Sequence, residues 1–419
     1  MPSALVIGGS LGGLFAANLL RAAGWRVDVY ERVADDLATR GAGIGTHDEL
    51  FAVMRRLGIA VDDTFGVKVN RRVCLDRAGD VLHEVALAQT MSAWSRIYRP
   101  LKDLLPAVNY HFGKTLERID EDADGVTACF GDGTTARGDL LVAADGVRST
   151  VRAQVLPAAQ PKYAGYVAWR GVVEEQAISP ATQAAIFDRY AFGLPVGEMM
   201  LAYPVPGRDD DVRPGRRNYN FVWYRPVDFV KKLPRMTTDA TGHCHGVAIP
   251  PPLITSAVVA EMRAEAKALL APQIYEIVER APQPFFQAIF DLESPRMAVG
   301  RVALLGDAAF VARPHVGMGV TKAALDAQCL AQALAAAPGD LSGALVRYDR
   351  ERRLFGTRVV ARARRLGAYI EARLKPPELR TLEECDQRPE IVMREIGANL
   401  ADIGELAMPA VPGPTTMRS

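Results

Sequence analysis

The strongest constraint on the fold is the segment 301–327, which reads RVALLGDAAFVARPHVGMGVTKAALDA. The apolar run 302–305 is short enough for a buried strand, a Gly-Asp pair interrupts it, and an Ala- and Leu-rich helical pattern follows the glycines. Asp307 is therefore expected just past a strand end, where a carboxylate can bind a sugar hydroxyl. Gly317 and Gly319 carry no Cβ, so the backbone can approach a flat ligand. This order predicts one part of a dinucleotide site.

The start of the chain predicts a second part, a strand, a glycine turn and a helix. Apolar residues 4–7 lead into the turn GGSLGG at 8–13, a helical pattern follows, and the next apolar run ends at Glu31. The helix amino terminus offers unpaired N–H groups to a pyrophosphate, and Glu31 can accept hydrogen bonds from a ribose. Ser10 replaces the middle glycine of the G-x-G-x-x-G fingerprint. Glycine turns also close ordinary βα units, so it is the downstream Glu31 that favours nucleotide binding.

A third segment, 139–152, is again an apolar strand followed by an Asp-Gly turn and helix-compatible residues. Asp145 and Arg148 can organise a site for a pyrophosphate or for an incoming nicotinamide dinucleotide, because arginine binds phosphate with a fork of donors. The alternative is a strand end with a solvated turn.

In order and spacing, these three segments resemble the single-component, class A flavin-dependent aromatic hydroxylases, which have the para-hydroxybenzoate hydroxylase fold, over about three quarters of the chain. The resemblance implies an α/β protein. It has a Rossmann-like FAD-binding domain, an inserted, mostly antiparallel β-sheet substrate domain, and C-terminal helices. It also implies FAD as the bound cofactor and NADH or NADPH as a transient one. In that family the first segment binds the ADP half of FAD, the Asp-Gly segment contacts FAD and NAD(P)H, and the Gly-Asp segment holds the ribityl chain.

Residue by residue, the resemblance assigns FAD contacts to positions in all three segments. These are Gly8, Ser10, Gly13, Glu31, Asp145, Gly146, Gly306, Asp307, Pro314, Gly317 and Gly319. Next to these motifs, we also expect contacts from Leu11, Arg32, Arg40, Tyr98 and Val320. The chain departs from the family in three places: Tyr98 stands near a usual arginine position, Thr321 at a usual asparagine, and Ala143 at a usual glycine. Arg40 can equally be a solvated turn residue.

Three further segments, YAGYVAWRG at 163–171, AYPVPGR at 202–208 and RPH at 313–315, look like the hydroxypyridine-hydroxylating branch of this family. The resemblance implies that NAD(P)H and O2 are used to hydroxylate a small electron-rich ring, such as 2,6-dihydroxypyridine, through a flavin C4a-hydroperoxide. Alternatives of the same fold are an epoxidase or a hydroxylase of a phenol or a purine. A flavin-binding protein without turnover is the alternative from another class.

The catalytic candidates are His315, Tyr203 and His47. His315 can donate a hydrogen bond to a substrate oxygen or cap backbone groups. Tyr203 can orient a hydroxylated ring, or it can be a core tyrosine with a satisfied hydroxyl. His47 can face the ring from the segment after Gly45. Four more residues can line the pocket or pack the sheet, with packing favoured for the two tryptophans: Trp169, Arg170, Trp223 and Tyr224.

Composition agrees with a soluble enzyme without a nucleic-acid or membrane partner. The chain has 419 residues, 49% of them hydrophobic, and a net charge of +1, so it can bury more than one core and has no global field to recruit nucleic acid. The first residues enter a strand directly and no apolar run approaches a membrane span, so we expect a cytoplasmic protein. The five cysteines are scattered without a CxxC pair, and the cluster 243–245 has no further spaced ligands, so we expect no metal site.

We predict an FAD-binding domain over 1–160 and 275–340, a substrate domain over 161–274 to which 70–100 can contribute, and a C-terminal helical segment over 341–419. Strands are expected within 67–86 and a hairpin over 117–132, and helices from 98 to 105, from 256 to 290 and from 342 to 373. The apolar stripe of that last helix, with Leu366, Tyr369, Ile370 and Leu374, predicts a packing face or a dimer surface, and we expect a homodimer.

Overall fold

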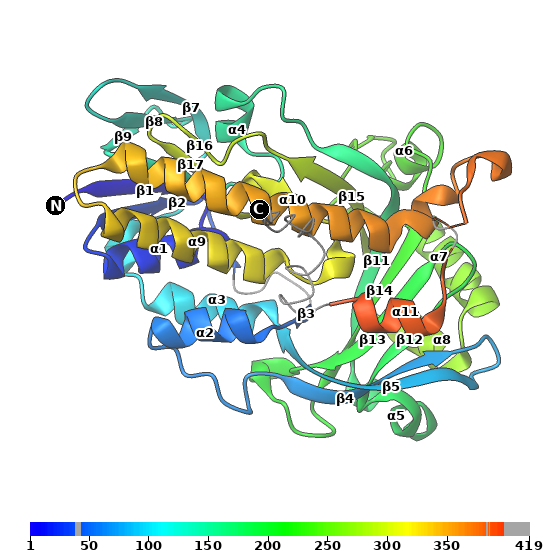
Figure 1. Ribbon diagram of the computed structural model, residues 1–419. Helices are drawn as coiled ribbons and strands as arrows, with labels where there is room; N and C mark the ends of the chain where they lie inside the picture. Colours follow the sequence, from blue (N-terminus) through cyan, green and yellow to red (C-terminus); the bar gives the residue numbers. More distant parts are fainter. Residues whose placement is uncertain (38–42, 383, 385, 398–419) are drawn as a thin grey trace, which may run out of the picture.

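A computed structural model of the protein describes residues 1–37, 43–382, 384 and 386–397. Over these residues the fold has a six-stranded sheet and a nine-stranded sheet, side by side under two long helices, with a small three-stranded sheet at one edge (Figure 1). The six-stranded sheet has the order β16 (Ala298–Val299), β17 (Val302–Leu304), β10 (Leu140–Ala143), β1 (Ser3–Ile7), β2 (Arg26–Tyr30) and β6 (Tyr110–His111). The α/β prediction is confirmed.

The centre of this sheet is made by the three segments that the sequence singles out. Strand β1 pairs in parallel with β2 on one side and with β10 on the other, and β10 pairs in parallel with β17. The carboxyl ends of parallel strands lie at one edge, so the glycine turn after β1, the Asp-Gly turn after β10 and the Gly-Asp turn after β17 come together there. Segments that are far apart in the chain therefore share one site.

The larger sheet is mixed and carries the antiparallel strands expected over 163–224. Its order is β18 (Phe310–Val311), β15 (Phe285–Glu293), β11 (Lys162–Glu174), β14 (Asn218–Pro226), β13 (Met199–Val205), β12 (Arg189–Gly193), β4 (Val67–Leu75), β5 (Val81–Ala93) and β3 (Gly43–Gly45). The predicted strands near 67–86 are thus β4 and β5. The predicted hairpin at 117–132 is confirmed as β7 (Leu116–Glu121) and β8 (Val126–Phe130), which β9 (Thr135–Gly138) extends.

Helices cover both sheets. They are α1 (Leu11–Ala22), α2 (Asp48–Arg56), α3 (Trp94–Asp103), α4 (Thr150–Val155), α5 (Pro180–Ile186), α6 (Lys232–Met236), α7 (Ser256–Leu269), α8 (Pro272–Arg280), α9 (Gly319–Ala336), α10 (Leu341–Ala372) and α11 (Pro389–Glu395). The helix expected over 256–290 is wrong in its last part, because 285–293 pairs with β11 as strand β15. The helix expected near 98 starts earlier, at Trp94. In the described part of the chain no helix is both long enough and apolar enough to cross a membrane.

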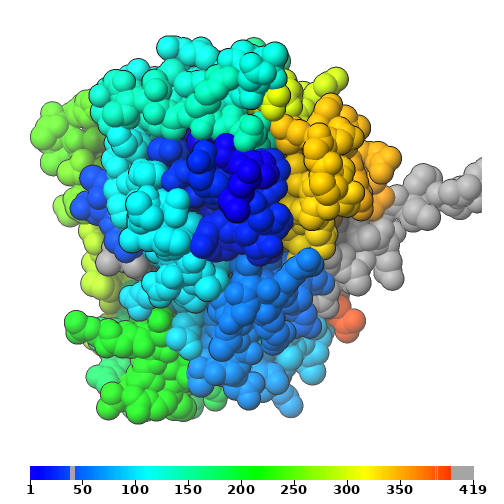
Figure 2. All heavy atoms as spheres, turned by 90° about the vertical axis from the view of Figure 1, so that its left-hand side faces the viewer, coloured from blue at the N-terminus to red at the C-terminus, as the bar shows by residue number. Residues whose placement is uncertain are grey.

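The long helix α10 runs from the smaller sheet to the larger one, beside α9 (Figure 1). Of its predicted apolar stripe, Leu366, Tyr369 and Ile370 are buried against the larger sheet, whereas Leu374 is 45% exposed. The stripe is therefore a packing face, and the homodimer stays a prediction. In the turned view, the first strand and helix lie between residues from about 100–150 and from the α9–α10 region (Figure 2).

Three strands of the larger sheet lie outside the range predicted for the substrate domain: β3 lies in the first predicted FAD-binding segment, and β15 and β18 lie in the second. Strands β4 and β5 also belong to the larger sheet, and they overlap the range 70–100 that is expected to contribute to the substrate domain. The domain limits themselves stay a prediction.

Candidate functional site

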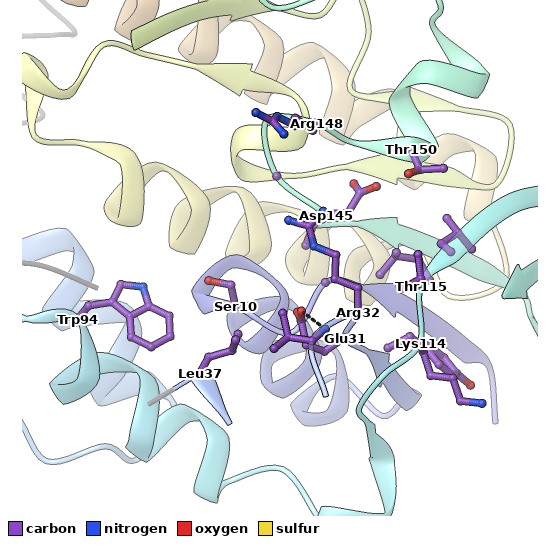
Figure 3. A pocket seen from close by; sticks show the side chains of 17 residues that line it. Ser10, Glu31, Arg32, Leu37, Trp94, Lys114, Thr115, Asp145, Arg148 and Thr150 are labelled. Carbon is purple, nitrogen blue, oxygen red and sulfur yellow. Dashed lines mark hydrogen bonds between the residues drawn. The ribbon is translucent and has the colours of Figure 1, made fainter. Parts of the chain in front are cut away.

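Two hollows lie between the sheets, and Trp94 lines both. The first, which we call the glycine-turn hollow, has a volume of about 390 Å³ and lies at the carboxyl edge of the smaller sheet (Figure 3). The second, the sheet hollow, has a volume of about 420 Å³ and lies on one face of the larger sheet. Together they offer an elongated site with a sheet edge at one end and a sheet face at the other.

The glycine turn is held by close backbone contacts. Gly8 has φ +104°, and a Cβ there would lie 2.4 Å from the Ala144 carbonyl oxygen. A Cβ on Gly13 would lie 1.9 Å from the Gly8 carbonyl oxygen, so the helix can follow the strand this closely only without that side chain. Leu11 begins α1 and is buried, while Ser10 precedes it and lines the hollow. The amino terminus of α1 therefore points its free N–H groups at this edge.

Glu31 lines the same hollow, and its carboxylate is engaged with the backbone. Oε2 accepts a hydrogen bond from the Gly9 N–H at 2.8 Å, and Oε1 accepts one from the Val33 N–H at 2.9 Å. Each oxygen keeps a second lone pair, so a ribose hydroxyl can still donate to it. Glu31 thus holds the glycine turn in shape as well as lining the predicted ribose site.

Arg32, Arg148 and Asp145 all line this hollow (Figure 3). Gly146 lines it beside Asp145 and adopts a positive φ of +80°. Oδ1 of Asp145 is buried and accepts no hydrogen bond from the described chain. Burial raises the pKa of this carboxyl group. The arginines supply the positive charge that a pyrophosphate needs.

Four predicted FAD contacts do not line either hollow: Leu11, Gly13, Gly306 and Tyr98. Tyr98 is fully buried behind Trp94, with ring centroids 4.5 Å apart, and it does not line either hollow. Trp94, one helical turn earlier in α3, lines both hollows instead. Nothing in the sequence around Trp94 indicated that it would line the site. Arg40 lies outside the described residues.

The turn after β17 puts Asp307 at the edge of the sheet hollow, as predicted. A buried ion pair that the sequence did not suggest holds this turn. Lys322 Nζ donates to the Gly306 carbonyl oxygen at 2.8 Å and lies 3.3 Å from Asp326 Oδ2, which also accepts from the Gly306 N–H. Lys322 and Asp326 are each 1% exposed. The Asp307 side chain itself is exposed at the edge of the hollow.

The glycine loop continues from this turn into α9. Pro314, Gly317, Gly319 and Val320 line the sheet hollow, and Gly317 has φ +65°. A Cβ on Gly319 would meet no atom of the described residues within 4 Å, so among these residues the loop presents bare backbone and the amino terminus of α9. This arrangement suits the flat, polar edge of a flavin ring.

The floor of the sheet hollow consists of one face of β11–β14–β13, with Arg170, Val222 and Leu201 side by side in register. Tyr203 lines the hollow as predicted, and its hydroxyl donates to the Gly43 carbonyl oxygen at 3.1 Å. The hydroxyl is thus satisfied as in a core tyrosine, and its role toward a ring stays a prediction. Burial raises the pKa of Tyr203 to about 12, so the phenol is protonated at neutral pH.

Trp169 and Trp223 lie on the opposite face of this sheet, in the core under α7 and α8. The packing role favoured for the tryptophans is confirmed. Tyr224 and Arg170 lie on the hollow side.

His315 lies at the bottom of the sheet hollow and is completely buried. Its Nε2 is 2.7 Å from the Tyr166 hydroxyl, and its ring centroid is 4.2 Å from that of Tyr224. Nδ1 is buried and has no hydrogen-bond partner in the described chain. Burial, helped by the charge of Arg313, lowers the pKa of His315 to about 3, so the imidazole is neutral at physiological pH.

His47 lies on the other side of the glycine loop and does not line the sheet hollow. It precedes α2, and its Nδ1 is 3.0 Å from the Thr321 hydroxyl. A Cβ on Gly317 would lie 3.8 Å from His47 Cε1, and the expectation that His47 faces the ring stays a prediction. Among the described residues, no group of three or more His, Cys, Asp or Glu side chains is arranged to hold a metal ion.

The two hollows fit FAD. The glycine-turn hollow offers a helix amino terminus, two arginines and a carboxylate with free lone pairs, which suit an ADP group. The sheet hollow offers the bare glycine loop and aromatic walls, which suit a flavin ring and a second small ring.

Comparisons with known proteins agree with this fit. Residues 163–291 match a family described as FAD binding domain-like, and residues 291–363 match an FAD binding domain family. The chain is 32% identical over 348 residues to the 2,6-dihydroxypyridine 3-monooxygenase of Paenarthrobacter nicotinovorans, which covers 82% of this chain and 85% of that protein. The chain belongs to the FAD-dependent aromatic-ring hydroxylases.

Two more comparisons place this hydroxylase within its family. The solved structure of 2,6-dihydroxypyridine-3-hydroxylase from Arthrobacter nicotinovorans superposes with a TM-score of 0.83 at 29% identity, over 90% of this chain and 95% of that one. The FAD-dependent urate hydroxylase of Klebsiella pneumoniae is 32% identical over 363 residues, which cover 83% of this chain and 85% of that protein. The relatives therefore differ in the ring they act on.

Replacing Asp307 by alanine should weaken FAD binding by this hydroxylase, because the carboxylate at the end of β17 is expected to accept hydrogen bonds from the ribityl chain. We expect the Kd for FAD to rise about tenfold, or about 1.4 kcal/mol. Fluorescence titration of the FAD-free protein would measure it. Asp103→Ala, at the exposed end of α3, is the matched control and should leave the Kd unchanged.

The low pKa of His315 predicts a loss of stability in acid. Between about pH 6.5 and 3 the unfolded chain protonates this imidazole and the folded protein does not, so the free energy of unfolding falls as pH falls, by about 1.4 kcal/mol per pH unit for one proton. Urea unfolding at pH 7, 6 and 5 should show a shallower fall for His315→Gln than for the wild type. His243→Gln, at an exposed position, should keep the wild-type slope. Identical slopes for all three proteins would mean that His315 titrates normally.

Proposed function

We propose that this protein is a monooxygenase that uses FAD, NAD(P)H and O2 to hydroxylate a small electron-rich aromatic ring, with a hydroxypyridine such as 2,6-dihydroxypyridine as the leading substrate class. The observation that carries the proposal is the sheet hollow itself. It has a volume of about 420 Å³, is lined by tyrosines and shares Trp94 with the glycine-turn hollow, and the bare glycine loop forms one side of it. The similarity to the 2,6-dihydroxypyridine 3-monooxygenase supports the substrate class.

In this proposal each segment has a defined part in holding FAD. The turn at 8–13 and Glu31 bind the ADP half, Arg32 and Arg148 face the pyrophosphate, and Asp307 binds the ribityl chain. The amino terminus of α9 faces the flavin ring. Bound FAD supplies the activation of O2 with electrons from NAD(P)H.

The residues of the sheet hollow orient the substrate and keep water away from it. Val222 and Leu201 give the floor an apolar surface. Tyr203 and Tyr224 keep their protons at neutral pH, because burial raises both pKa values. With Tyr166 as the donor to His315 Nε2, the imidazole proton sits on Nδ1, and this N–H is free to donate to a substrate oxygen.

The test is substrate-stimulated NADH oxidation by the purified holoenzyme. We expect 2,6-dihydroxypyridine to accelerate NADH consumption and to gain one oxygen atom, read by product mass. Replacing NADH by NADPH shows which dinucleotide is used. Urate and simple phenols are the comparison substrates, because a urate hydroxylase is as similar to this chain in sequence identity. Stimulation by urate alone would move the substrate class to purines, and bound flavin without stimulation by any ring would contradict the proposal.

Tyr203→Phe should lower the coupling of NADH oxidation to hydroxylation. The variant loses the hydrogen bond to Gly43, so the wall of the hollow beside the ring is held less firmly. We expect the product formed per NADH to fall by about twofold or more, with hydrogen peroxide making up the difference and FAD content unchanged. Tyr275→Phe removes a hydroxyl from the distant helix α8 and serves as the control. Wild-type coupling in Tyr203→Phe would remove Tyr203 from the site.

A further inference from the structure

Arg170 lies in the sheet hollow, and no described residue is its hydrogen-bond or ion-pair partner. It belongs to β11 and pairs across the sheet with Val222 and Phe285, both of which also line the hollow. Directly paired residues project to the same face, so the Arg170 side chain lies on the hollow side of the sheet. Its Nε is buried and has no acceptor, and within the described residues the guanidinium makes no hydrogen bond and no ion pair.

Three other buried arginines in or near the larger sheet donate hydrogen bonds to carboxylate, amide or carbonyl oxygens. Arg313, which lines the same hollow, contacts Asp291 and Glu371, each at 2.8 Å. Arg217 is paired with Glu175 at 2.8 Å. Arg72 has no carboxylate but donates to Gln89 and to two backbone carbonyl oxygens. Arg170 differs from all of these.

The groups around Arg170 are phenols. Its charge opposes the rise in pKa that burial causes at Tyr190, Tyr203 and Tyr224, so all three rings lie within its field. Asp307 is the one carboxylate among the described residues that line the hollow, and it forms no ion pair with Arg170. The hollow therefore has a half-buried cation that no carboxylate of the described residues pairs with.

An uncompensated charge of this kind is unfavourable in the free protein, and a bound anion would remove the penalty. Guanidinium also presents a planar fork of donors that fits two oxygens or an oxygen beside a ring nitrogen. An ionised ring hydroxyl or a ring carboxylate offers this chemistry, and a neutral ring does not.

We propose that Arg170 binds an anionic oxygen of the ring substrate, so that the sheet hollow selects singly negative rings over neutral rings of the same shape. The inference rests on the proposed function for the place of the substrate, and it adds the charge of that substrate and the residue that recognises it. Arg170 is the specificity-determining residue of the hollow.

Binding of matched ring pairs tests the proposal without requiring turnover. Benzoate and benzamide have nearly the same shape and differ in charge at neutral pH. Titrated into the FAD-loaded enzyme and followed by the flavin absorbance change and by calorimetry, benzoate should bind about tenfold or more tightly than benzamide. In Arg170→Met this preference should disappear, and in Arg170→Lys, which keeps the charge but loses the fork, it should be intermediate. Arg71→Met, which removes an exposed arginine of β4, should keep the wild-type preference.

Thermal melting separates this role from a structural one. Arg170→Met removes an unpaired cation from a partly buried position, so the ligand-free holoenzyme should melt at the same temperature as the wild type or higher, with unchanged FAD content. Benzoate should raise the melting temperature of the wild type and not that of the variant. A lower melting temperature together with an unchanged benzoate preference would overturn the proposal and make Arg170 a packing residue.

The outcomes also distinguish this inference from the proposed function. If the wild type hydroxylates 2,6-dihydroxypyridine but Arg170→Met keeps the preference for benzoate, the inference fails and the function stands. If no hydroxypyridine is turned over but the preference depends on Arg170, the anion site stands and the substrate is another negative ring. If Arg170→Met does not fold, equal binding of benzoate and benzamide by Arg170→Lys or by the wild type overturns the inference.

Discussion

The buried carboxylate of Asp326 fixes the position of the whole site. It accepts from the Gly306 N–H, lies 3.3 Å from Lys322 Nζ and accepts from Arg352 of α10 at 2.7 Å. The end of β17, the start of α9 and the middle of α10 are therefore joined at one point. Removing one member of so buried a pair costs about 3–5 kcal/mol, because the remaining charge stays in the interior without a partner. This junction therefore helps to fix the positions of Asp307 and the glycine loop.

Both hollows are connected to this junction. On one side, β17 pairs with β10 and β10 pairs with β1, and the ends of these two strands carry the Asp-Gly and glycine turns. On the other side, the glycine loop that follows Asp307 in the sequence lies against the face of the larger sheet that bears Tyr203 and Arg170. The charged residues under the turns differ from the one in the sheet hollow in whether they are paired. Under the turns the charges are paired and buried, whereas Arg170 in the sheet hollow forms no ion pair with any described residue.

Much of the fold could be predicted from local pattern. The strand–turn–helix order at 301–327, the glycine turn at 8–13 and the helical character of 342–373 follow from periodicity and from glycine placement, which act within a few residues. The pattern leaves open whether 342–373 forms one helix or two, and the structure has the single helix α10. The helical expectation failed at 285–293, where the short apolar pattern allows either structure and pairing with β11 decides for a strand. The burial of the Lys322–Asp326 pair could not be predicted from the sequence, because two opposite charges four residues apart usually lie on a solvated helix face.

The sequence by itself determined that three distant segments would each end a parallel strand with a turn suited to a dinucleotide, because glycines and a following carboxylate are local requirements of such turns. Only the tertiary structure decided which side chains face the ring. Strand residues alternate between two faces of the sheet. Which of these faces borders the hollow is known only once the packing on both sides of the sheet is known. That is why Arg170 and Tyr224 line the hollow while Trp169 and Trp223 fill the core, and why Trp94 takes the place expected of Tyr98.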